Sequence, residues 1–229
     1  MNAVITGGTR GIGRAIALKL AAEGYHLAIC SRNSAELLAF KNELEKLGIQ
    51  VFTFKADLAI KSEVYAFCEA VENVMKEVDV LINNAGVFLT GSLLDEADDQ
   101  FESMADVNLK AAYYCGKYFG KIMRKQQFGH VFNICSVASK QIAENAGSYS
   151  VTKTAMYSLN HVFREELSKY NVKVTAVLPG STLTSSWEGT TIPEARFVQP
   201  EDIANSIWNV LNLSDGANVE EITIKPVQF

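Results

Sequence analysis

The chain has 229 residues and a formal net charge of −5, with 21 Lys and Arg against 26 Asp and Glu. Its 48% hydrophobic and 21% charged residues are ordinary for a globular protein and exclude a disordered or collagen-like chain. The acidic balance argues against broad electrostatic binding to nucleic acid. No apolar run approaches the ~20 residues of a membrane span, and residues 1–10 contain no cleavable signal pattern. We therefore expect one cytoplasmic domain over residues 1–229, with no nucleic-acid or membrane partner.

Short β-branched runs alternate with long amphipathic stretches along the whole chain, which is typical of βα units that feed a parallel sheet. We expect strands over residues 3–6, 27–31, 51–55, 80–83, 131–135, 173–177 and 221–224. Helices are expected over residues 12–23, 34–47, 62–76, 98–126, 148–170 and 201–213. The fold class is then α/β, a single-domain, Rossmann-like, doubly wound parallel sheet of about seven strands flanked by helices.

Two glycines and one irregular segment complete the outline. Gly24 and Gly48 stand where helices should end, because glycine readily adopts the left-handed conformation of a helix C-terminus. Residues 180–199 lack clear periodicity, are rich in Ser and Thr, and are too long for a simple connection. We expect this segment to be a mobile lid near a ligand site at the carboxyl ends of the strands.

The four cysteines stand far apart, and no C-x-x-C pair suggests a metal site or a redox couple. We interpret them as reduced residues that pack in the interior. The three histidines are isolated from one another and from every cysteine, so we expect no metal. These residues are Cys30, Cys68, Cys115 and Cys135, and His26, His130 and His161.

A glycine-rich turn, Thr6-Gly7-Gly8-Thr9-Arg10-Gly11-Ile12-Gly13, follows the first expected strand and opens a helix. Glycine lets the backbone approach a pyrophosphate, and the free N–H groups of the helix start attract the anion. The spacing differs from the G-x-G-x-x-G fingerprint of dinucleotide-binding folds. The expected cofactor contacts here are Gly7, Thr9, Arg10, Gly11, Ile12 and Gly13.

The T-G-x-x-x-G-x-G pattern of this turn resembles the short-chain dehydrogenase/reductase family. The resemblance continues along nearly the whole chain: Asp57-Leu58 follows the third strand, where the family places an aspartate against adenine. Asn83-Asn84-Ala85-Gly86 matches the family's N-N-A-G signature after the fourth strand. The resemblance implies cofactor contacts from Asp57, Leu58, Asn84, Ala85 and Gly86, and a role of the last segment in stabilising the sheet.

Tyr149 and Lys153 are four residues apart near the start of an expected helix and therefore share one face. A phenol loses its proton only near pH ~10, and an adjacent ammonium stabilises the anion. A second Y-x-x-x-K copy runs from Tyr113 to Lys117, which we interpret as an ordinary helix pairing. Tyr149 is preferred because Ser136, at the end of a strand, stands where the family has its substrate-binding serine.

The resemblance implies a catalytic set of Asn108, Ser136, Tyr149 and Lys153. Tyr149 would act as general acid in carbonyl reduction while Ser136 polarises the carbonyl. Lys153 would support Tyr149 and hold the nicotinamide ribose together with it, and Asn108 would support a proton relay. The family's P-G-x-x-x-T segment, which contacts the carboxamide, matches Pro179, Gly180 and Thr184, and Thr182 within it is added to the expected cofactor contacts.

The end of the second strand indicates which nicotinamide cofactor is bound. NAD enzymes of this fold place an acidic residue there to bind the ribose 2′-hydroxyl. Residues 30–33 hold no carboxylate, whereas Arg32, Ser31 and the loop residue Arg10 can bind a 2′-phosphate. We therefore expect an NADP(H)-dependent oxidoreductase that transfers a hydride between nicotinamide and a small carbonyl or alcohol.

Two alternative functions stay open, and the sequence does not name the substrate. One is a 3-oxoacyl-carrier-protein reductase of fatty acid synthesis, with an acidic acyl carrier protein docked on Lys121, Arg124 and Lys125. The other is a non-catalytic nucleotide-binding sensor or scaffold. The resemblance also implies a homotetramer or homodimer. The expected substrate lining is moderately apolar and comprises Phe88, Leu89, Val137, Ile142 and Trp187.

Overall fold

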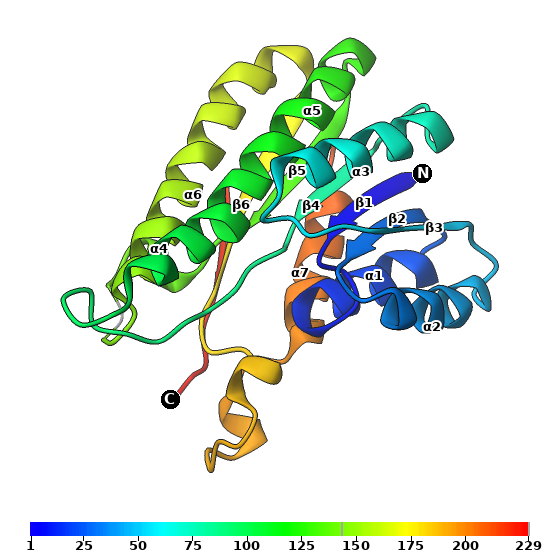
Figure 1. Cartoon of the computed structure of the whole chain (residues 1–229). Helices are drawn as coiled ribbons and strands as arrows, with labels where there is room; N and C mark the ends of the chain where they lie inside the picture. The colour runs from blue at the N-terminus through cyan, green and yellow to red at the C-terminus, as the bar shows by residue number, and fades with distance from the viewer. Residues whose placement is uncertain (143, 229) are drawn as a thin grey trace.

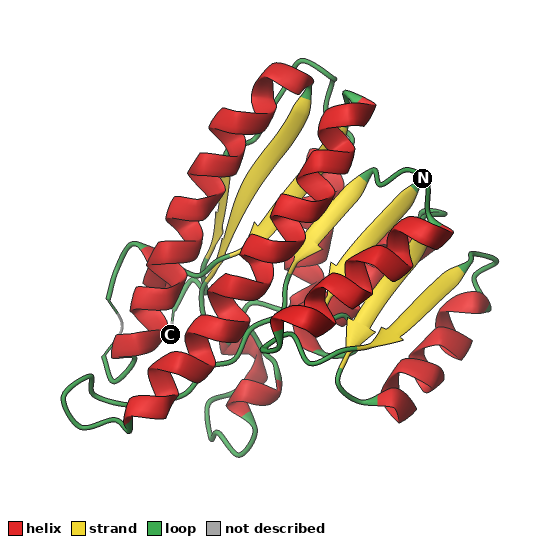
Figure 2. Cartoon of the chain, turned by 45° about the horizontal axis from the view of Figure 1, so that its top comes forward, coloured by secondary structure: helices red, strands yellow, loops and turns green. Residues whose placement is uncertain are grey.

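A computed structural model describes residues 1–142 and 144–228. Its centre is a seven-stranded sheet in the order β3-β2-β1-β4-β5-β6-β7, with every pairing parallel. Helices cover both faces of the sheet (Figures 1 and 2). The strands are β1 (Asn2–Thr6), β2 (His26–Ser31), β3 (Val51–Lys55), β4 (Val80–Asn83), β5 (Gly129–Ile134), β6 (Val172–Pro179) and β7 (Glu221–Ile224).

The helices form two layers, each with its own hydrophobic cluster. One layer consists of α1 (Gly11–Ala22), α2 (Ser34–Glu45) and α7 (Pro200–Leu211). The other contains α3 (Lys61–Val74), α5 (Ala111–Gln126) and α6 (Gly147–Leu167), and α4 (Asp98–Ala105) precedes α5. The expected doubly wound α/β fold is confirmed.

Strand β1 shows why its residues form a central strand. Ala3 and Ile5 point toward the α1 layer, while Val4 points toward the α3 and α5 layer. All three side chains are fully buried, because helices cover both faces. Strands covered on both sides consist of continuous apolar residues rather than an alternation of apolar and polar ones. The sheet's buried faces therefore follow from its sequence.

The expected strands and most expected helices are present, with ends that differ by a few residues. Gly24 and Gly48 have φ of +83° and +80° and end their helices as expected. The prediction of one helix over residues 98–126 was wrong, because a π-helical turn, η1 (Asp106–Lys110), separates α4 from α5. The expected helix over residues 148–170 likewise gives way to a 3₁₀ turn, η3 (Ser168–Tyr170), after Leu167.

The irregular segment from residue 180 to residue 199 has short elements of its own. Two 3₁₀ turns, η4 (Ser185–Trp187) and η5 (Glu194–Arg196), lie within it. Its two ends meet in a bridge between Thr182 and Val198. The segment projects below the sheet in Figure 1, coloured gold, as a compact excursion between β6 and α7. Its closure over a ligand stays a prediction.

All four cysteines are free and buried, as expected of packing residues. Burial raises the pKa of the Cys135 thiol to about 12, which leaves it protonated and unreactive. Among the described residues, no group of three or more His, Cys, Asp or Glu is placed to hold a metal ion. None of the helices in this part of the chain is long and apolar enough to cross a membrane.

His130 is a buried histidine with a fixed tautomer. Its Nε2 lies 2.7 Å from Thr175 Oγ1, and that hydroxyl donates its single proton to the Val219 carbonyl at 2.6 Å. His130 Nε2 must therefore be the donor to Thr175. Burial, with a contribution from Lys173, lowers the pKa of His130 to about 3. The native state thus holds His130 neutral where an unfolded chain would bind a proton.

This difference predicts acid sensitivity. The contribution of neutral His130 to the free energy of unfolding is fully present above the unfolded histidine pKa of ~6.5. It is lost as the pH falls from there toward 3, because in this range only the unfolded chain binds the proton. At pH 5 the loss amounts to about 2 kcal/mol. His130→Gln, which lacks the titrating group, should lose less stability between pH 7.5 and pH 5 in urea unfolding. Parallel pH dependences of wild type and variant would contradict this assignment.

Candidate active site

The glycine-rich loop lies at the point where the strand order reverses, between β1 and β4. Gly7 and Gly11 have φ of +65° and +51°, conformations that favour glycine. Arg10 is the N-cap of α1, its side chain makes no capping bond, and the first turn holds no acidic residue. The backbone N–H groups and positive end of the α1 dipole are thus available to an anion.

Asn84 fastens this loop to the sheet. Its Nδ2 donates to the carbonyls of Thr6 and Gly7 at 3.0 and 2.9 Å. Thr6 Oγ1 accepts from the backbone N–H groups of Asn84 and Ala85 at 3.0 and 3.1 Å. The segment after β4 therefore stabilises the sheet and loop, which is one of the two roles expected for it.

The tightest position is Gly13, where a Cβ would meet Asn84 Nδ2 at 2.4 Å and Gly7 O at 2.5 Å. Gly13→Ala should force the loop away from Asn84 and cost about 1 to 3 kcal/mol of stability, as overpacking does. Gly216→Ala, where a Cβ meets nothing within 4 Å, is the matched control and should leave thermal unfolding nearly unchanged. Equal melting temperatures for the two variants would contradict the packing described for Gly13.

Lys153 is buried beneath the site at the start of α6. Its Nζ donates to the carbonyl of Ile134, the last residue of β5, at 2.8 Å, and lies 5.8 Å from the Tyr149 ring centre. A Cβ on Gly86 would lie 3.5 Å from the same Nζ and 3.2 Å from Asn108 Oδ1. Asn108, Lys153, Tyr149 and the N-N-A-G segment therefore meet at one place.

Asn108 explains the break in the long helix. It lies in the π-helical turn and is fully buried. Its Oδ1 accepts from the Val87 N–H at 2.7 Å, and its Nδ2 donates to the Val87 carbonyl at 3.0 Å and to Thr152 Oγ1 at 3.2 Å. Thr152 in turn donates to the Tyr149 carbonyl. Single π-turns inside α-helices occur often at functional sites, and this one links the loop after β4 to α6.

Ser136 follows β5 and caps the 3₁₀ turn η2 (Val137–Ser139). Its Oγ accepts from Ala138 N at 3.1 Å, which leaves the hydroxyl proton available to a substrate oxygen. Ser139 Oγ accepts from Ser136 N and donates to the Lys153 carbonyl at 2.9 Å. Ser136 and Lys153 are thereby joined through one intermediate residue.

The second Y-x-x-x-K copy is an ordinary helix pairing, but both of its residues are on the surface. Tyr113 is 42% exposed on α5, and Lys117 Nζ lies 5.6 Å above its ring. Phe88, by contrast, packs edge-on against Tyr149 with ring centres 4.8 Å apart. Of the expected apolar lining, Phe88 and Leu89 are partly exposed, Val137 is half-buried in η2, Ile142 is largely exposed, and Trp187 packs on Phe197.

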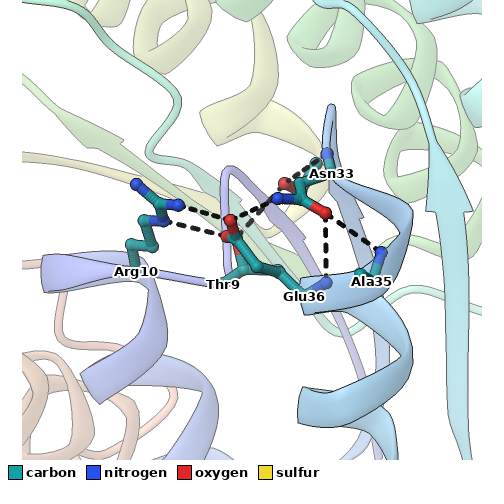
Figure 3. A network of polar contacts seen from close by, with 6 residues as sticks. Thr9, Arg10, Asn33, Ala35 and Glu36 are labelled. Atoms are coloured by element: carbon teal, nitrogen blue, oxygen red, sulfur yellow. Dashed lines mark hydrogen bonds and ion pairs between the residues drawn. The ribbon is translucent and has the colours of Figure 1, made fainter.

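The adenosine end differs from expectation. Arg10 forms a two-point ion pair with Glu36, so its guanidinium is not free. Figure 3 shows the Glu36 carboxylate between Arg10 and Asn33. Its bond to Arg10 holds the pKa of Glu36 below its usual range. Arg32 is exposed at the end of β2, and Ser31 Oγ accepts from Thr9 Oγ1 at 3.2 Å.

Sequence reasoning missed Glu36 because it examined only residues 30–33 for a carboxylate. The signal was present as the N-x-x-E spacing at a helix start, which is a capping pattern. Asn33 Oδ1 caps α2 by accepting from Ala35 N and Glu36 N at 3.0 and 3.2 Å. The first turn of α2 then directs Glu36 back toward the glycine-rich loop.

The other expected cofactor residues lie along the same edge. Asp57 follows β3 and accepts from Ala59 N at 3.0 Å, and Leu58 beside it is buried. Pro179 ends β6, and Gly180 N donates to Ile224 O at 2.7 Å. A Cβ on Gly11 would lie 3.2 Å from Thr184 Cγ2, so the segment from residue 180 to residue 199 contacts the glycine-rich loop. Thr182 Oγ1 donates to the Gly180 carbonyl at 3.0 Å.

Comparison with known proteins agrees with this geometry. The sequence model of the family described as short chain dehydrogenase matches residues 1–194. An uncharacterized oxidoreductase of Staphylococcus aureus (strain USA300) is 32% identical over 225 residues, covering 98% of this chain and 96% of that protein. The chain belongs to the short-chain dehydrogenase family.

Solved structures of similar proteins extend the agreement over the full length. An alcohol dehydrogenase from the archaeon Thermococcus sibiricus, complexed with 5-hydroxy-NADP, has a TM-score of 0.93 and 29% identity. The match covers 100% of this chain and 97% of that one. A metagenomic short-chain oxidoreductase in complex with NADP has a TM-score of 0.87 and 29% identity, with 100% and 98% covered.

Proposed function

We propose that the protein is an NADP(H)-dependent oxidoreductase that transfers a hydride between nicotinamide and a small carbonyl or alcohol. The observation that carries the proposal is the meeting of Asn108, Tyr149 and the buried Lys153 beside the glycine-rich loop. The NADP complexes of two similar structures support the choice of cofactor. Among the two open alternatives, a non-catalytic sensor would not need this buried constellation.

The residues present fit a dinucleotide. The uncapped start of α1 suits the pyrophosphate, and Gly7 and Gly13 let the loop pack closely against the segment after β4. Asp57 and Leu58 would contact adenine. Ala85 and Gly86 would contact the adjoining ribose and the nicotinamide side. Tyr149 and Lys153 would hold the nicotinamide ribose. Pro179, Gly180, Thr182 and Thr184 would face the carboxamide. When bound, the cofactor supplies or accepts the hydride.

The chain's own residues would handle the proton and the substrate oxygen. Ser136 donates its hydroxyl proton to the carbonyl oxygen and orients it. Tyr149 donates a proton to the same oxygen in reduction and accepts it in oxidation. The Lys153 ammonium stabilises negative charge on the phenol oxygen. Asn108 holds Val87 and Thr152 in place through its side-chain hydrogen bonds.

Tyr149→Phe should keep the fold and cofactor binding while lowering kcat about 10²- to 10⁴-fold, because it removes only the transferable proton. Tyr113→Phe, on the exposed face of α5, is the matched control and should retain wild-type kcat. A panel of carbonyl compounds with NADPH absorbance as the readout provides the assay. Unchanged kcat in Tyr149→Phe would remove Tyr149 from the mechanism, and a large loss in Tyr113→Phe would show that the wrong copy was chosen.

The preference for NADP(H) would depend mainly on Arg32. Arg10 is paired with Glu36, whereas Arg32 is exposed and forms no ion pair with any of the described residues. Arg32→Ala should reduce kcat/KM for NADPH about tenfold or more, since charge-assisted bonds contribute ~1.5 to 3 kcal/mol, and should leave that for NADH nearly unchanged. Measuring both cofactors in wild type and variant decides the matter. An unchanged NADPH to NADH ratio in the variant would remove Arg32 from the explanation.

The carrier-protein alternative gains no support from geometry. The basic residues proposed for docking lie toward the end of α5, far from Asn108; they are Lys121, Arg124 and Lys125. At this end of the helix, Gln126 makes hydrogen bonds with the backbone of Val78, just before β4. The segments near Tyr149 are acidic instead. Asp95, Glu96 and Glu144 lie in the loops joined by the bridge between Gly91 and Ala146, and Asp98 and Asp99 open α4. An uncharged, moderately apolar carbonyl compound suits this surface better than an acidic protein. The cytoplasmic location and the homodimer or homotetramer remain predictions.

A further inference from the structure

The carboxylate of Glu36 lies near the place where the cofactor's ribose 2′ position is expected. In dinucleotide-binding folds an acidic residue at the end of β2 binds the 2′-hydroxyl, so that strand end marks the place. Thr9 Oγ1 lies 3.2 Å from Ser31 Oγ at the end of β2 and 3.3 Å from Glu36 Oε2. One hydroxyl group thus separates the Glu36 carboxylate from the strand end.

The same carboxylate forms an ion pair with the Arg10 guanidinium. Arg10 donates from both Nε and Nη2 to the two Glu36 oxygens, a geometry that a phosphate would otherwise accept. Asn33 Nδ2 donates to Glu36 Oε1 at 2.6 Å, and the Asn33 cap fixes the turn of α2 that carries Glu36 (Figure 3). Arg10 keeps 69% of its side chain exposed, so it can exchange partners.

We propose that Glu36 is a specificity-determining residue that competes with the cofactor's 2′-phosphate for Arg10. The inference rests on the proposed function, since it concerns the same cofactor site. A dianionic 2′-phosphate near Glu36 meets a fixed negative charge and an arginine that is already neutralised. A 2′-hydroxyl meets no such penalty, because it can donate a hydrogen bond to the carboxylate. Glu36 therefore reduces the preference for NADP(H) that Arg10 and Arg32 would otherwise give.

Binding of two adenosine nucleotides that differ only at the 2′ position tests this directly. Isothermal titration with adenosine 2′,5′-bisphosphate and with adenosine 5′-monophosphate needs neither substrate nor turnover. Glu36→Gln should tighten the bisphosphate about tenfold, the effect of freeing one charge-assisted contact. Binding of the monophosphate should not tighten.

The neighbouring ion pair provides the matched control. Arg14 and Glu43 join α1 to α2 as Arg10 and Glu36 do, with Nη2 2.6 Å from Glu43 Oε1, but they take no part in the contacts with Thr9 and Ser31. Glu43→Gln removes one surface carboxylate without freeing Arg10. It should change binding of the bisphosphate less than twofold, which separates the local competition from a general change in net charge.

Arg10→Ala, made in both backgrounds, identifies the residue for which Glu36 competes. In the wild-type background it should weaken the bisphosphate only about twofold, because Arg10 is already paired. In the Glu36→Gln background it should abolish the tenfold gain. Equal effects in the two backgrounds would overturn the proposed competition.

The outcomes separate this inference from the function on which it rests. If the wild type and all variants bind neither nucleotide, the proposed cofactor site fails and the inference fails with it. If both nucleotides bind but Glu36→Gln leaves their affinity ratio unchanged, only the inference fails. If Glu36→Gln weakens the bisphosphate, Glu36 instead holds Arg10 in position for phosphate, which also overturns the competition.

Discussion

The junction of β1 with β4 is the constraint on which the rest of the site depends. These strands are neighbours in the sheet, yet the chain leaves them toward opposite faces, so the segments that follow them diverge. The Asn84 amide and the Thr6 hydroxyl hold the two departing segments together with four hydrogen bonds. An apolar residue at position 84 would leave two carbonyls without these donors, and the loop would lose its fixed distance from the sheet.

A second polar connection crosses the sheet farther along. Asn83 on β4 donates to Asn133 on β5 at 2.8 Å, and Asn133 donates to Asn160 on α6 at 2.9 Å, all within the buried interior. Within the described part of the chain, Asn83 Oδ1 and Asn160 Nδ2 have no hydrogen-bond partner. Buried amides that are only partly satisfied cost stability. Their arrangement fixes the register of the strands against the helix that carries Tyr149 and Lys153.

The sequence could predict those parts of the site that depend on a single local segment. The glycine-rich turn, the Tyr149 to Lys153 spacing and the positions of the strands all rest on periodicity or short motifs, and the structure brings Asn108, Tyr149 and Lys153 together. The π-helical turn could not be predicted this way. It depends on the bonds of Asn108 to Val87, a residue 21 positions away, whereas helix periodicity reports only on near neighbours.

Glu36 was missed for a related reason. A motif read at the end of β2 assumes that the charges near a ribose come from the strand end, but a capped helix start returns a side chain to the same place. Counting arginines then overestimates the attraction for a phosphate, because the count omits the partner that each arginine already has. Affinity for an anion is the difference between its bonds to the site and the bonds that the site gives up. Around Lys153 the contacts are buried and fixed, whereas the ion pair between Arg10 and Glu36 leaves 69% of the Arg10 side chain exposed and can exchange partners. Cofactor preference is therefore altered more easily than the arrangement of the catalytic residues.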